Sequence, residues 1–597
     1  MPTSTCDILV VGASLGGVAA ALSAARAGKA TVLVSGSNWV GGQMTSQGVC
    51  TPDDNAYVDT TGSTASYQEF RQLCRQYYQT NYTLSEYGQQ QVQAVGHLNL
   101  GQCWVNMGFA VEPLVGDKLL KQMLSDAGVT LLLSQTVQSA GLAPDNNSVE
   151  TITIVGSDGT ETQISFSFVL DATDLGDLLP LAGVEFQLGA ESVAQTGEPD
   201  AAADAPHQNW IQPITYPFAL ERCPVGEVHT IPEPPNYAAV RDSQNFSLTD
   251  GNITGMFVPR PLPAGQGTPL AFWTYRRVVA AGLFTPTGGP YNNDVATINV
   301  AGNDYLDDVI PTGDPAHDAQ VLANARAVSL CYLYWLQTES PRDAGDGSGT
   351  GYPNLRPVTE FWNTPDAISP DVYVREGRRI QALVTIKEQD IVTEDAEQND
   401  LNTGSRAQLF TDTGGIGLYD MDIHANNLGQ KEFYLGTKPF QIPLGSLVPI
   451  RVTNLLPACK NLGVTHLTNG AYRLHPIEWN VGETSAALAA YCIDEKVTPQ
   501  AAVQDSGRIL AIQAKLLAAG IPIFWWSDVL STDNYFVAAQ KLGAAGVITG
   551  TGGLAFSPDE IITTDEENAL SERIAPRLAA WPTTPITRAQ AADILAE

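Results

Sequence analysis

A glycine-rich turn near the N-terminus carries the clearest chemical meaning in this sequence. The apolar run Asp7–Val11 leads into Gly12-Ala-Ser-Leu-Gly16-Gly17, an alanine-rich stretch follows, and a second apolar run covers Thr31–Val34. This order predicts the strand, turn, helix and strand of a dinucleotide-binding βαβ unit. A pyrophosphate binds the free amides at such a helix N-terminus, where the helix dipole favours negative charge. The residues expected to contact it are Gly12, Ser14, Leu15, Gly16 and Gly17.

Two positions depart from the usual form of this turn. Ser14 stands where a glycine lets the backbone approach the pyrophosphate, and Ser35-Gly36 stands where an acidic residue binds the ribose hydroxyls. A serine hydroxyl donates to phosphate or accepts from ribose, so Ser14, Ser35 and Gly36 stay in the predicted site. The turn alone therefore predicts a nucleotide without saying which one.

The composition describes a large globular protein with an acidic surface. The chain has 597 residues, of which 44% are hydrophobic and 16% charged, and 31 basic against 64 acidic residues give a net charge of −33. Such a surface repels nucleic acid and anionic membranes, so we expect neither as a partner. The eight cysteines form no CxxC pair and the seven histidines show no metal-binding spacing, so free thiols and no metal are expected.

The apolar stretch Ile8–Ala25 has an alternative interpretation as a signal-peptide core or a membrane span. No basic segment precedes it, Asp7 lies at its edge, and glycines interrupt it where the nucleotide turn needs them. No other stretch is long and apolar enough to cross a membrane. We therefore expect a cytoplasmic protein that acts on a small molecule, and the sequence is compatible with a homo-oligomer.

Composition divides the chain into four parts. Prolines and glycines become frequent after about residue 185, and apolar periodic order resumes near residue 374. The fold class predicted is α/β: a Rossmann-like nucleotide-binding domain formed by residues 1–184 and 374–498, with a mixed α+β substrate domain inserted at residues 185–373. The amphipathic run Gln500–Ala519 predicts one long helix at the start of a small helical domain, residues 499–597.

Several further motifs occur along the chain in a fixed order. They are Trp39–Val49 (WVGGQMTSQGV), Phe109–Pro113 (FAVEP), Asp171–Asp177 (DATDLGD), Arg375–Ile380 (REGRRI) and Arg473–Glu483 (RLHPIEWNVGE). Together they resemble the FAD-dependent oxidoreductase family of the glutathione-reductase-type flavoprotein superfamily, over nearly the whole chain. The resemblance implies FAD as the cofactor and a fold of the glutathione-reductase type, and it does not name a substrate.

The resemblance also implies flavin contacts in the first half of the chain. Gly41 and Gly42 are expected beside the pyrophosphate and ribityl groups, and Gln43, Met44 and Thr45 beside the isoalloxazine; the alternative is a buried structural turn. After the strand that ends at Asp171, the loop with Ala172, Thr173 and Gly176 is expected to pass the pyrophosphate. Val137 is expected to pair with adenine or to be an ordinary buried residue.

In the second half, a helix is expected to begin after Gly482. Its first amides, at Gly482 and Glu483, are then expected to meet the ribityl phosphate or the flavin O2 edge, where helix amides stabilise negative charge. An acidic residue at a helix start is also what plain helix capping shows, so both interpretations of Glu483 stay open.

The chemistry predicted is oxidation of a C–H next to nitrogen or oxygen, or a desaturation, with hydride transfer to flavin N5 and a base supplied by the protein. His475 is the first candidate base, because imidazole titrates near neutrality, and a structural hydrogen bond is the alternative. Arg473 is expected to anchor a carboxylate or tune the flavin, or to form an ordinary ion pair. His424 and His466 are weaker candidates. No second glycine fingerprint for NAD(P)H is present, which favours an oxidase or dehydrogenase.

Two alternatives to this function remain. The C-terminal segments Trp526–Val529, Gly546–Gly550 and Phe556–Pro558 resemble a single surface-layer homology repeat, which implies a wall-associated protein. The departures at Ser14 and Ser35 leave room for a non-catalytic flavin- or dinucleotide-binding protein. Cell fractionation tests the first alternative, because a wall-associated protein must be exported. Reduction of bound flavin by a small molecule would exclude the second alternative.

Overall fold

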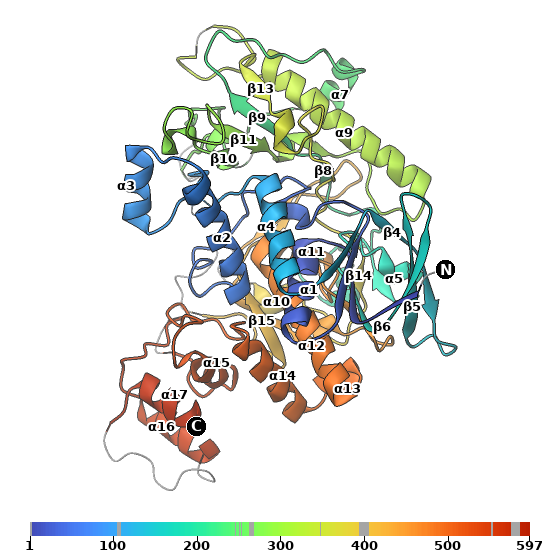
Figure 1. The fold of residues 1–597 in the computed structure, drawn as a ribbon, viewed down its shortest axis with the longest axis vertical. Helices are drawn as coiled ribbons and strands as arrows, with labels where there is room; N and C mark the ends of the chain where they lie inside the picture. Colours follow the sequence, from blue (N-terminus) through green and yellow to red (C-terminus); the bar gives the residue numbers. More distant parts are fainter. Residues whose placement is uncertain are drawn as a thin grey trace.

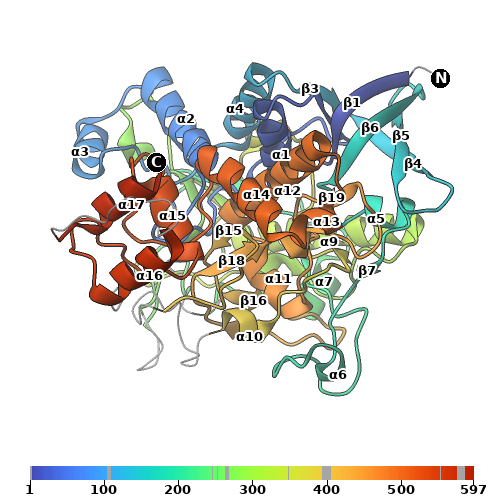
Figure 2. The same ribbon diagram turned by 90° about the horizontal axis from the view of Figure 1, so that it is seen from below.

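A computed structural model gives the fold (Figures 1 and 2). It describes residues 3–103, 109–244, 246–249, 251, 253–261, 268–346, 348–392, 405–550, 553–574 and 585–596. Part of the predicted apolar segment Gln102–Val111 lies outside these residues. None of the helices described there combines the length and the apolar character that crossing a bilayer requires.

A seven-stranded mixed sheet forms the centre of the molecule. Its strand order is β3-β2-β1-β6-β5-β4, and β19 pairs with the C-terminal half of β6. The strands are β1 (Thr3–Val11), β2 (Thr31–Ser35), β3 (Thr130–Leu133), β4 (Gln135–Leu142), β5 (Val149–Gly156), β6 (Glu161–Asp171) and β19 (Leu455–Pro457). The pairs among β3, β2, β1, β6 and β19 are parallel, which confirms a Rossmann-like α/β core.

The predicted first βαβ unit is confirmed, since α1 (Leu15–Arg26) connects β1 to β2. Helix α1 packs on α12 (His475–Glu495), which lies more than four hundred residues later, and α4 (Pro113–Asp126) precedes β3 (Figure 1). The two helices approach closely because both carry glycine at the contact. A Cβ built on Gly482 would lie 2.0 Å from the Gly16 carbonyl oxygen.

A second, antiparallel sheet lies at the other end of the molecule, in green and yellow at the top of Figure 1. Its order is β10-β11-β9-β13, and α9 packs near it around a separate apolar core that includes Phe218, Tyr332 and Trp335. The elements of this part are β8 (Ile214–Thr215), β9 (Phe218–Arg222), α7 (Tyr237–Gln244), α8 (Phe272–Tyr275), β10 (Arg277–Val279), β11 (Val295–Ile298), β12 (Asp304–Tyr305), α9 (Pro315–Thr338) and β13 (Leu355–Pro357). All of them fall inside the range predicted as an insertion.

Shorter elements join the two sheets. They are α2 (Ala65–Asn81), α3 (Glu86–Val95), α5 (Leu178–Leu181), β7 (Phe186–Gln187), α6 (Val193–Thr196), β14 (Arg379–Ile380), α10 (Glu388–Ile391), β15 (Thr413–Gly417), β16 (Met421–Ile423), β17 (Phe433–Leu435), β18 (Phe440–Pro443) and α11 (His466–Tyr472), with 3-10 turns η1 (Gly42–Met44), η2 (Ala281–Leu283), η3 (Ala301–Asn303), η4 (Thr359–Phe361) and η5 (Leu444–Leu447).

The C-terminal part packs on the body of the molecule. Its helices are α13 (Pro499–Val503), α14 (Ser506–Ala518), α15 (Phe536–Ala544), α16 (Thr564–Ile574) and α17 (Arg588–Ala596). The single helix predicted over Gln500–Ala519 is wrong, because the Asp505 carboxylate accepts from the Arg508 amide and starts a new helix there. Beyond it, the Arg406 guanidinium stacks over Phe524 at 4.3 Å and Trp526 at 4.6 Å, which joins this part to the body.

Candidate active site

Two connected cavities lie at the carboxyl edge of the parallel sheet. The smaller, here the edge cavity, has a volume of about 200 Å³, and the larger, the loop cavity, about 320 Å³. They share the lining residues Gly12, Ser35, Gly36, Thr173 and Asp177. The ends of β1, β2 and β6 meet at this edge because these strands are parallel. One elongated ligand can therefore extend through both cavities, in the place where open α/β sheets bind nucleotides.

The N-terminus of α1 faces the loop cavity through Ala13 and Ser14. Helix geometry leaves the first amides without partners in the helix. The Gly17 amide donates to the Ser14 hydroxyl at 3.1 Å, and the Gly16 amide donates to the Glu478 carboxylate at 2.9 Å. The amides of Ser14 and Leu15 are then the ones left for an anion. Gly12 makes the close turn, because its φ is +104° and a Cβ there would lie 2.2 Å from the Ala172 carbonyl oxygen.

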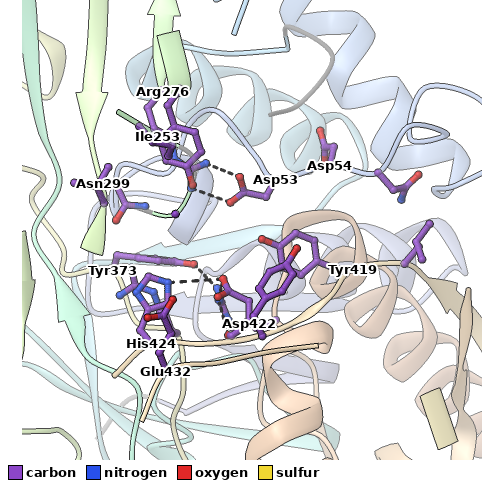
Figure 3. Close-up of a pocket in the computed structure, with 18 residues that line it drawn as sticks. Asp53, Asp54, Ile253, Arg276, Asn299, Tyr373, Tyr419, Asp422, His424 and Glu432 are labelled. Carbon is purple, nitrogen blue, oxygen red and sulfur yellow. Dashed lines mark hydrogen bonds and ion pairs between the residues drawn. The ribbon is translucent and has the colours of Figure 1, made fainter. Parts of the chain in front are cut away.

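A third cavity, the polar pocket, has a volume of about 510 Å³ and lies beside the antiparallel sheet, where Arg276 precedes β10 and Asn299 follows β11 (Figure 3). Its lining comes from distant parts of the chain: Asp53, Asp54, Asn55, Gly251, Ile253, Tyr275, Arg276, Asn299, Val300, Tyr373, Arg375, Leu418, Tyr419, Asp422, His424, Glu432, Tyr434 and Arg473. The volume suits a small organic molecule.

Ion pairs order the charged side chains of this pocket. Arg276 binds both oxygens of Asp53 at 2.9 Å, and Arg473 binds Asp422 at 3.0 Å. His424 Nδ1 lies 2.6 Å from Asp304, which also binds Arg375 at 3.1 Å. In Figure 3, Arg276 and Asp53 lie on one side of the pocket, and Asp422 and His424 on the other.

Two titratable groups of the pocket have strongly altered acidity. Burial and Arg375 oppose protonation of His424, but Asp304 and Asp422 outweigh them and raise its pKa to about 9. Burial raises the pKa of the Asp54 carboxyl to about 7, against the opposite effect of Arg71, to which it is bonded. At neutral pH the pocket therefore contains a protonated imidazole and a carboxyl that titrates.

One extended segment, Asp371–Arg375, forms a wall of both the loop cavity and the polar pocket. Asp371, Val372 and Val374 line the loop cavity, whereas Tyr373 and Arg375 line the polar pocket. Tyr373 pairs with β8 through hydrogen bonds to Thr215 at 2.8 and 3.2 Å. From Val372 to Arg375 the lining alternates between the two cavities, as side chains alternate between the two faces of an extended chain.

Comparison with known protein families identifies the cofactor of this chain. A family model described as FAD dependent oxidoreductase matches residues 7–516. The chain belongs to the FAD-dependent oxidoreductase family. FAD is therefore its cofactor, and the residues present fit it: two connected cavities end at a glycine turn with free helix amides, and the buried Oε1 of Gln47 in the loop cavity has no protein partner among the described residues.

The remaining comparisons add nothing about the chemistry of this FAD-dependent oxidoreductase. A comparison with curated protein sequences gave no match. Among solved structures, the myxobacterial chondrochloren halogenase CndH shares 10% identity over 96% of this chain and 90% of its own, with a TM-score of 0.33. The aromatic hydroxylase CabE shares 14% identity with a TM-score of 0.27, over 64% of this chain, and the match spans about half of CabE, 54%. We draw no argument from similarities at this level.

The structure brings most of the predicted nucleotide residues together. Gly12, Ser14, Ser35, Gly36, Gly42, Ala172 and Thr173 line the loop cavity, and Val137 lines the edge cavity. Gly16, Gly17, Gly41 and Gly176 line neither cavity and instead shape the turns and helix contacts around them. A Cβ on Gly17, for example, would lie 2.2 Å from the Gly12 carbonyl oxygen. The Leu15 side chain is buried at the start of α1, and its amide alone is left for a ligand.

The expectation for Gln43, Met44 and Thr45 does not match the structure. All three side chains are fully buried, and none lines the cavities described here. The η1 turn directs Gln43 toward Glu478 and the Arg473 carbonyl oxygen, at 3.1 Å from the latter. Ser46 and Gln47 line the loop cavity in their place. The motif therefore predicted that this loop lines the cavity, but not which of its side chains do so, because the conformation of the η1 turn determines their direction.

The prediction of a helix start after Gly482 is wrong. Helix α12 begins at His475, so Gly482 lies within the helix and its amide is not a free terminal donor. Gly482 instead allows the contact with α1, and Glu483 accepts from the Ser66 hydroxyl. Burial raises the pKa of Glu483 to about 7. Gly482 therefore allows the two helices to pack. Helix α12 begins before the predicted start because Pro476 is compatible with the first turn of a helix.

The two predicted catalytic residues have different outcomes. Arg473 lines the polar pocket, where its guanidinium also contacts the Tyr373 hydroxyl at 2.9 Å. His475 is fully buried and lies outside the polar pocket, with Nε2 at 2.9 Å from the Val49 carbonyl oxygen. A carbonyl only accepts, so Nε2 donates, and burial holds the pKa of His475 well below its usual value. Its geometry matches the structural alternative, and the weaker candidate His424 faces the pocket instead.

Sequence reasoning missed Asp371 and most charged residues of the polar pocket, although it named Arg473 and His424. The Ser37 hydroxyl donates to Asp371 at 3.0 Å, so a carboxylate reaches the edge of the sheet beside Ser35 from a distant segment. No spacing in the sequence signals such a contact. The only clue was the short motif that begins at Arg375.

Among the described residues, one group of metal-type side chains comes together, formed by Cys223, Glu227 and His229. His229 Nε2 lies 2.9 Å from Glu227, which accounts for this pair as a hydrogen bond. The absence of a metal stays a prediction.

Proposed function

We propose that the protein is an oxidase or dehydrogenase in which a small organic substrate in the polar pocket loses a hydride from a C–H next to nitrogen or oxygen. Bound FAD would supply the hydride acceptor, its N5 atom. The observation that supports this proposal is the shared wall Asp371–Arg375, because it places a pocket of substrate size directly beside the cavity that fits the cofactor.

The same proposal assigns places to the cofactor within a glutathione-reductase-type fold. Val137, Ser35 and Gly36 hold the adenosine in the edge cavity. The amides of Ser14 and Leu15 bind the pyrophosphate at the positive end of α1. Gly42, Ser46, Gln47, Ala172 and Thr173 surround the remainder in the loop cavity.

Arg473 and Asp54 are the pocket residues that we propose act on the substrate. Arg473 is held by Asp422 and Tyr373, so it orients the substrate through a fixed guanidinium. Asp54 takes up the proton that leaves the substrate heteroatom, since its pKa of about 7 suits proton transfer near neutrality. His424, which stays protonated, keeps Asp304 and Asp422 ionised.

We propose a cytoplasmic enzyme in which the C-terminal part stabilises the catalytic body. Arg406 donates to the carbonyl oxygens of Trp525 at 2.8 Å and Leu554 at 3.2 Å. These contacts occupy one face of this part against the body.

The experiment is an anaerobic absorption titration of the purified protein. The expected result is an oxidised-flavin spectrum that bleaches when amines, amino acids, alcohols or sugars are added one class at a time. Absence of flavin bands after FAD is supplied would contradict the cofactor assignment.

The variant Arg473→Lys tests the polar pocket. It keeps the positive charge but loses the planar, two-pronged hydrogen bonding of the guanidinium, so bleaching should slow by about 10- to 100-fold while FAD stays bound. Bleaching at the unchanged rate would contradict the role of the polar pocket.

A further inference from the structure

We propose that the polar pocket selects an uncharged, hydroxyl-rich substrate, of the sugar or polyol class, over carboxylic acids and amines. The proposal rests on the proposed function, because it takes this pocket as the substrate site. Three features of the pocket support it: its balanced charges, its mixed set of unpaired hydrogen-bonding atoms, and its apolar lining.

The first feature is that the fixed charges of the pocket cancel. Four positive side chains line the pocket, Arg276, Arg375, Arg473 and His424, and ion pairs join them to three carboxylates, Asp53, Asp304 and Asp422. Glu432, an exposed residue of the lining outside these ion pairs, brings the negative groups to four. Asp54 is paired with Arg71, outside this set. The pocket therefore carries no net charge that would offset the hydration an ionic substrate loses on entry, and this loss is costly.

The second feature is that buried donors and a buried acceptor are both left unpaired. Within the described part of the chain, the Nε atoms of Arg276 and Arg473 and the Oδ1 atom of Asn299 are buried and have no hydrogen-bond partner. A carboxylate accepts but cannot donate, and an ammonium donates but cannot accept. A hydroxyl does both, so a molecule with several hydroxyls matches this mixed set better than a group that only donates or only accepts.

The third feature is that flat and aliphatic side chains lie between the polar groups. Tyr373 and Tyr419 lie across the pocket from Ile253, as Figure 3 shows. Leu418 adds to this apolar lining. A sugar ring presents C–H groups as well as hydroxyls, so it matches a lining that alternates apolar surface with polar groups.

The test compares three ligands that share one carbon skeleton and differ in charge: glucose, gluconate and glucosamine. Sorbitol, galactose, xylose and myo-inositol extend the neutral set. Binding to the FAD-loaded protein is measured anaerobically by perturbation of the flavin spectrum, and oxidation by flavin bleaching. At least one neutral ligand should bind about tenfold more tightly than either charged analogue. Tighter binding of gluconate or glucosamine, or no binding by any neutral ligand, would overturn the proposal.

The two readouts separate this inference from the proposed function. Neutral ligands that bind without bleaching the flavin would support the substrate class and contradict the oxidation. Bleaching by an amino acid or a hydroxy acid, with no response to neutral ligands, would support the oxidation and contradict the substrate class.

Charge variants make the inference sharper. Asp53→Asn removes the partner of Arg276 and leaves one positive charge unbalanced, so the ratio of gluconate to glucose binding should rise about tenfold. Glu432→Gln makes the same change of net charge at an exposed residue of the pocket. It replaces Asp53→Asn in this experiment if that variant does not fold. Glu69→Gln removes the carboxylate that binds Arg26 at 2.8 Å on the surface, and should leave the ratio unchanged. An unchanged ratio in both pocket variants would overturn the role of charge balance.

Discussion

The edge and loop cavities, which we propose hold FAD, and the polar pocket are adjacent but are built in different ways. The edge and loop cavities depend on backbone geometry at strand ends, with Gly12, Gly36 and Gly42 in their lining. The polar pocket depends on side-chain charges from segments hundreds of residues apart, such as Asp53 with Arg276 and Asp422 with Arg473. At Gly12 and Gly42 the first construction leaves no room for a Cβ, which would lie 2.2 and 2.9 Å from backbone atoms. We expect the second construction to be sensitive to a change of charge instead.

This difference predicts two kinds of sensitivity. Adding one carbon beside the cofactor should abolish binding of FAD, whereas changing a pocket residue should alter turnover or specificity and leave FAD in place. The predictions below test this contrast, beginning with the largest expected effect.

Gly12→Ala should abolish binding of FAD. The new Cβ would lie 2.2 Å from the Ala172 carbonyl oxygen, and the backbone φ of +104° adds strain of about 1–3 kcal/mol. Flavin content after purification and FAD titration measures the effect. Gly282→Ala is the control, because a Cβ there meets nothing within 4 Å and should leave FAD content unchanged. Normal flavin content in the Gly12→Ala protein would contradict the claim that the close turn at Gly12 is required for binding of FAD.

Asp54→Asn should lower kcat by about 100-fold or more while FAD stays bound. A proton acceptor must be ionised, so wild-type kcat should rise with pH through about 7, where Asp54 titrates, and the variant should lose this rise. Steady-state rates between pH 5 and 9 measure both effects. Asp59→Asn is the matched control, because Asp59 binds Arg71 at 2.7 Å in the same network but does not line the pocket. A pH profile lost equally in both variants would show that the network, not Asp54, is responsible.

His475→Gln should keep turnover within about threefold, because His475 donates one buried hydrogen bond to Val49 and lies outside the polar pocket. The glutamine amide can replace the Nε2 donor, so the expected loss of stability is about 1 kcal/mol. Denaturant unfolding and steady-state kinetics give the two numbers. A loss of kcat comparable to that of Asp54→Asn would restore His475 as the base.

Glu483→Gln should have the smallest effect on function and raise stability at high pH. The pKa of Glu483 is about 7 in the folded protein, above its usual value, so its favourable contribution is complete in acid and disappears as pH rises through 7. The variant should therefore unfold at a higher temperature than the wild type at pH 8, by the equivalent of about 1–3 kcal/mol, and match it at pH 5. Thermal unfolding at both pH values measures this. Loss of FAD from the variant would support the flavin-contact interpretation instead.

The sequence predicted the features that depend on backbone geometry better than those that depend on side-chain charges. The turn Gly12–Gly17 and the loop with Gly42 were recognised because a required backbone conformation leaves glycines at fixed spacings. Gly482 also belongs to a recognised motif, but a glycine is needed there because the helix contacts α1 at this position. The motif alone does not tell whether its glycine marks the start of a helix or a contact between two helices. His475 attracted attention as a titratable residue, whereas burial and a carbonyl partner make it structural. His424 became the pocket histidine because Asp304 and Asp422 meet it there.

The amino-acid sequence by itself determined the βαβ unit, the place of the nucleotide turn and, through its motifs, FAD as the cofactor. These depend on local conformation, which nearby residues dictate. The tertiary structure decided which side chains face the cavities, the pairing of Arg276, Arg473 and His424 with their carboxylates, and the wall Asp371–Arg375 shared by two cavities. Burial and charge pairing depend on residues that only folding brings together, and spacing along the chain does not record them.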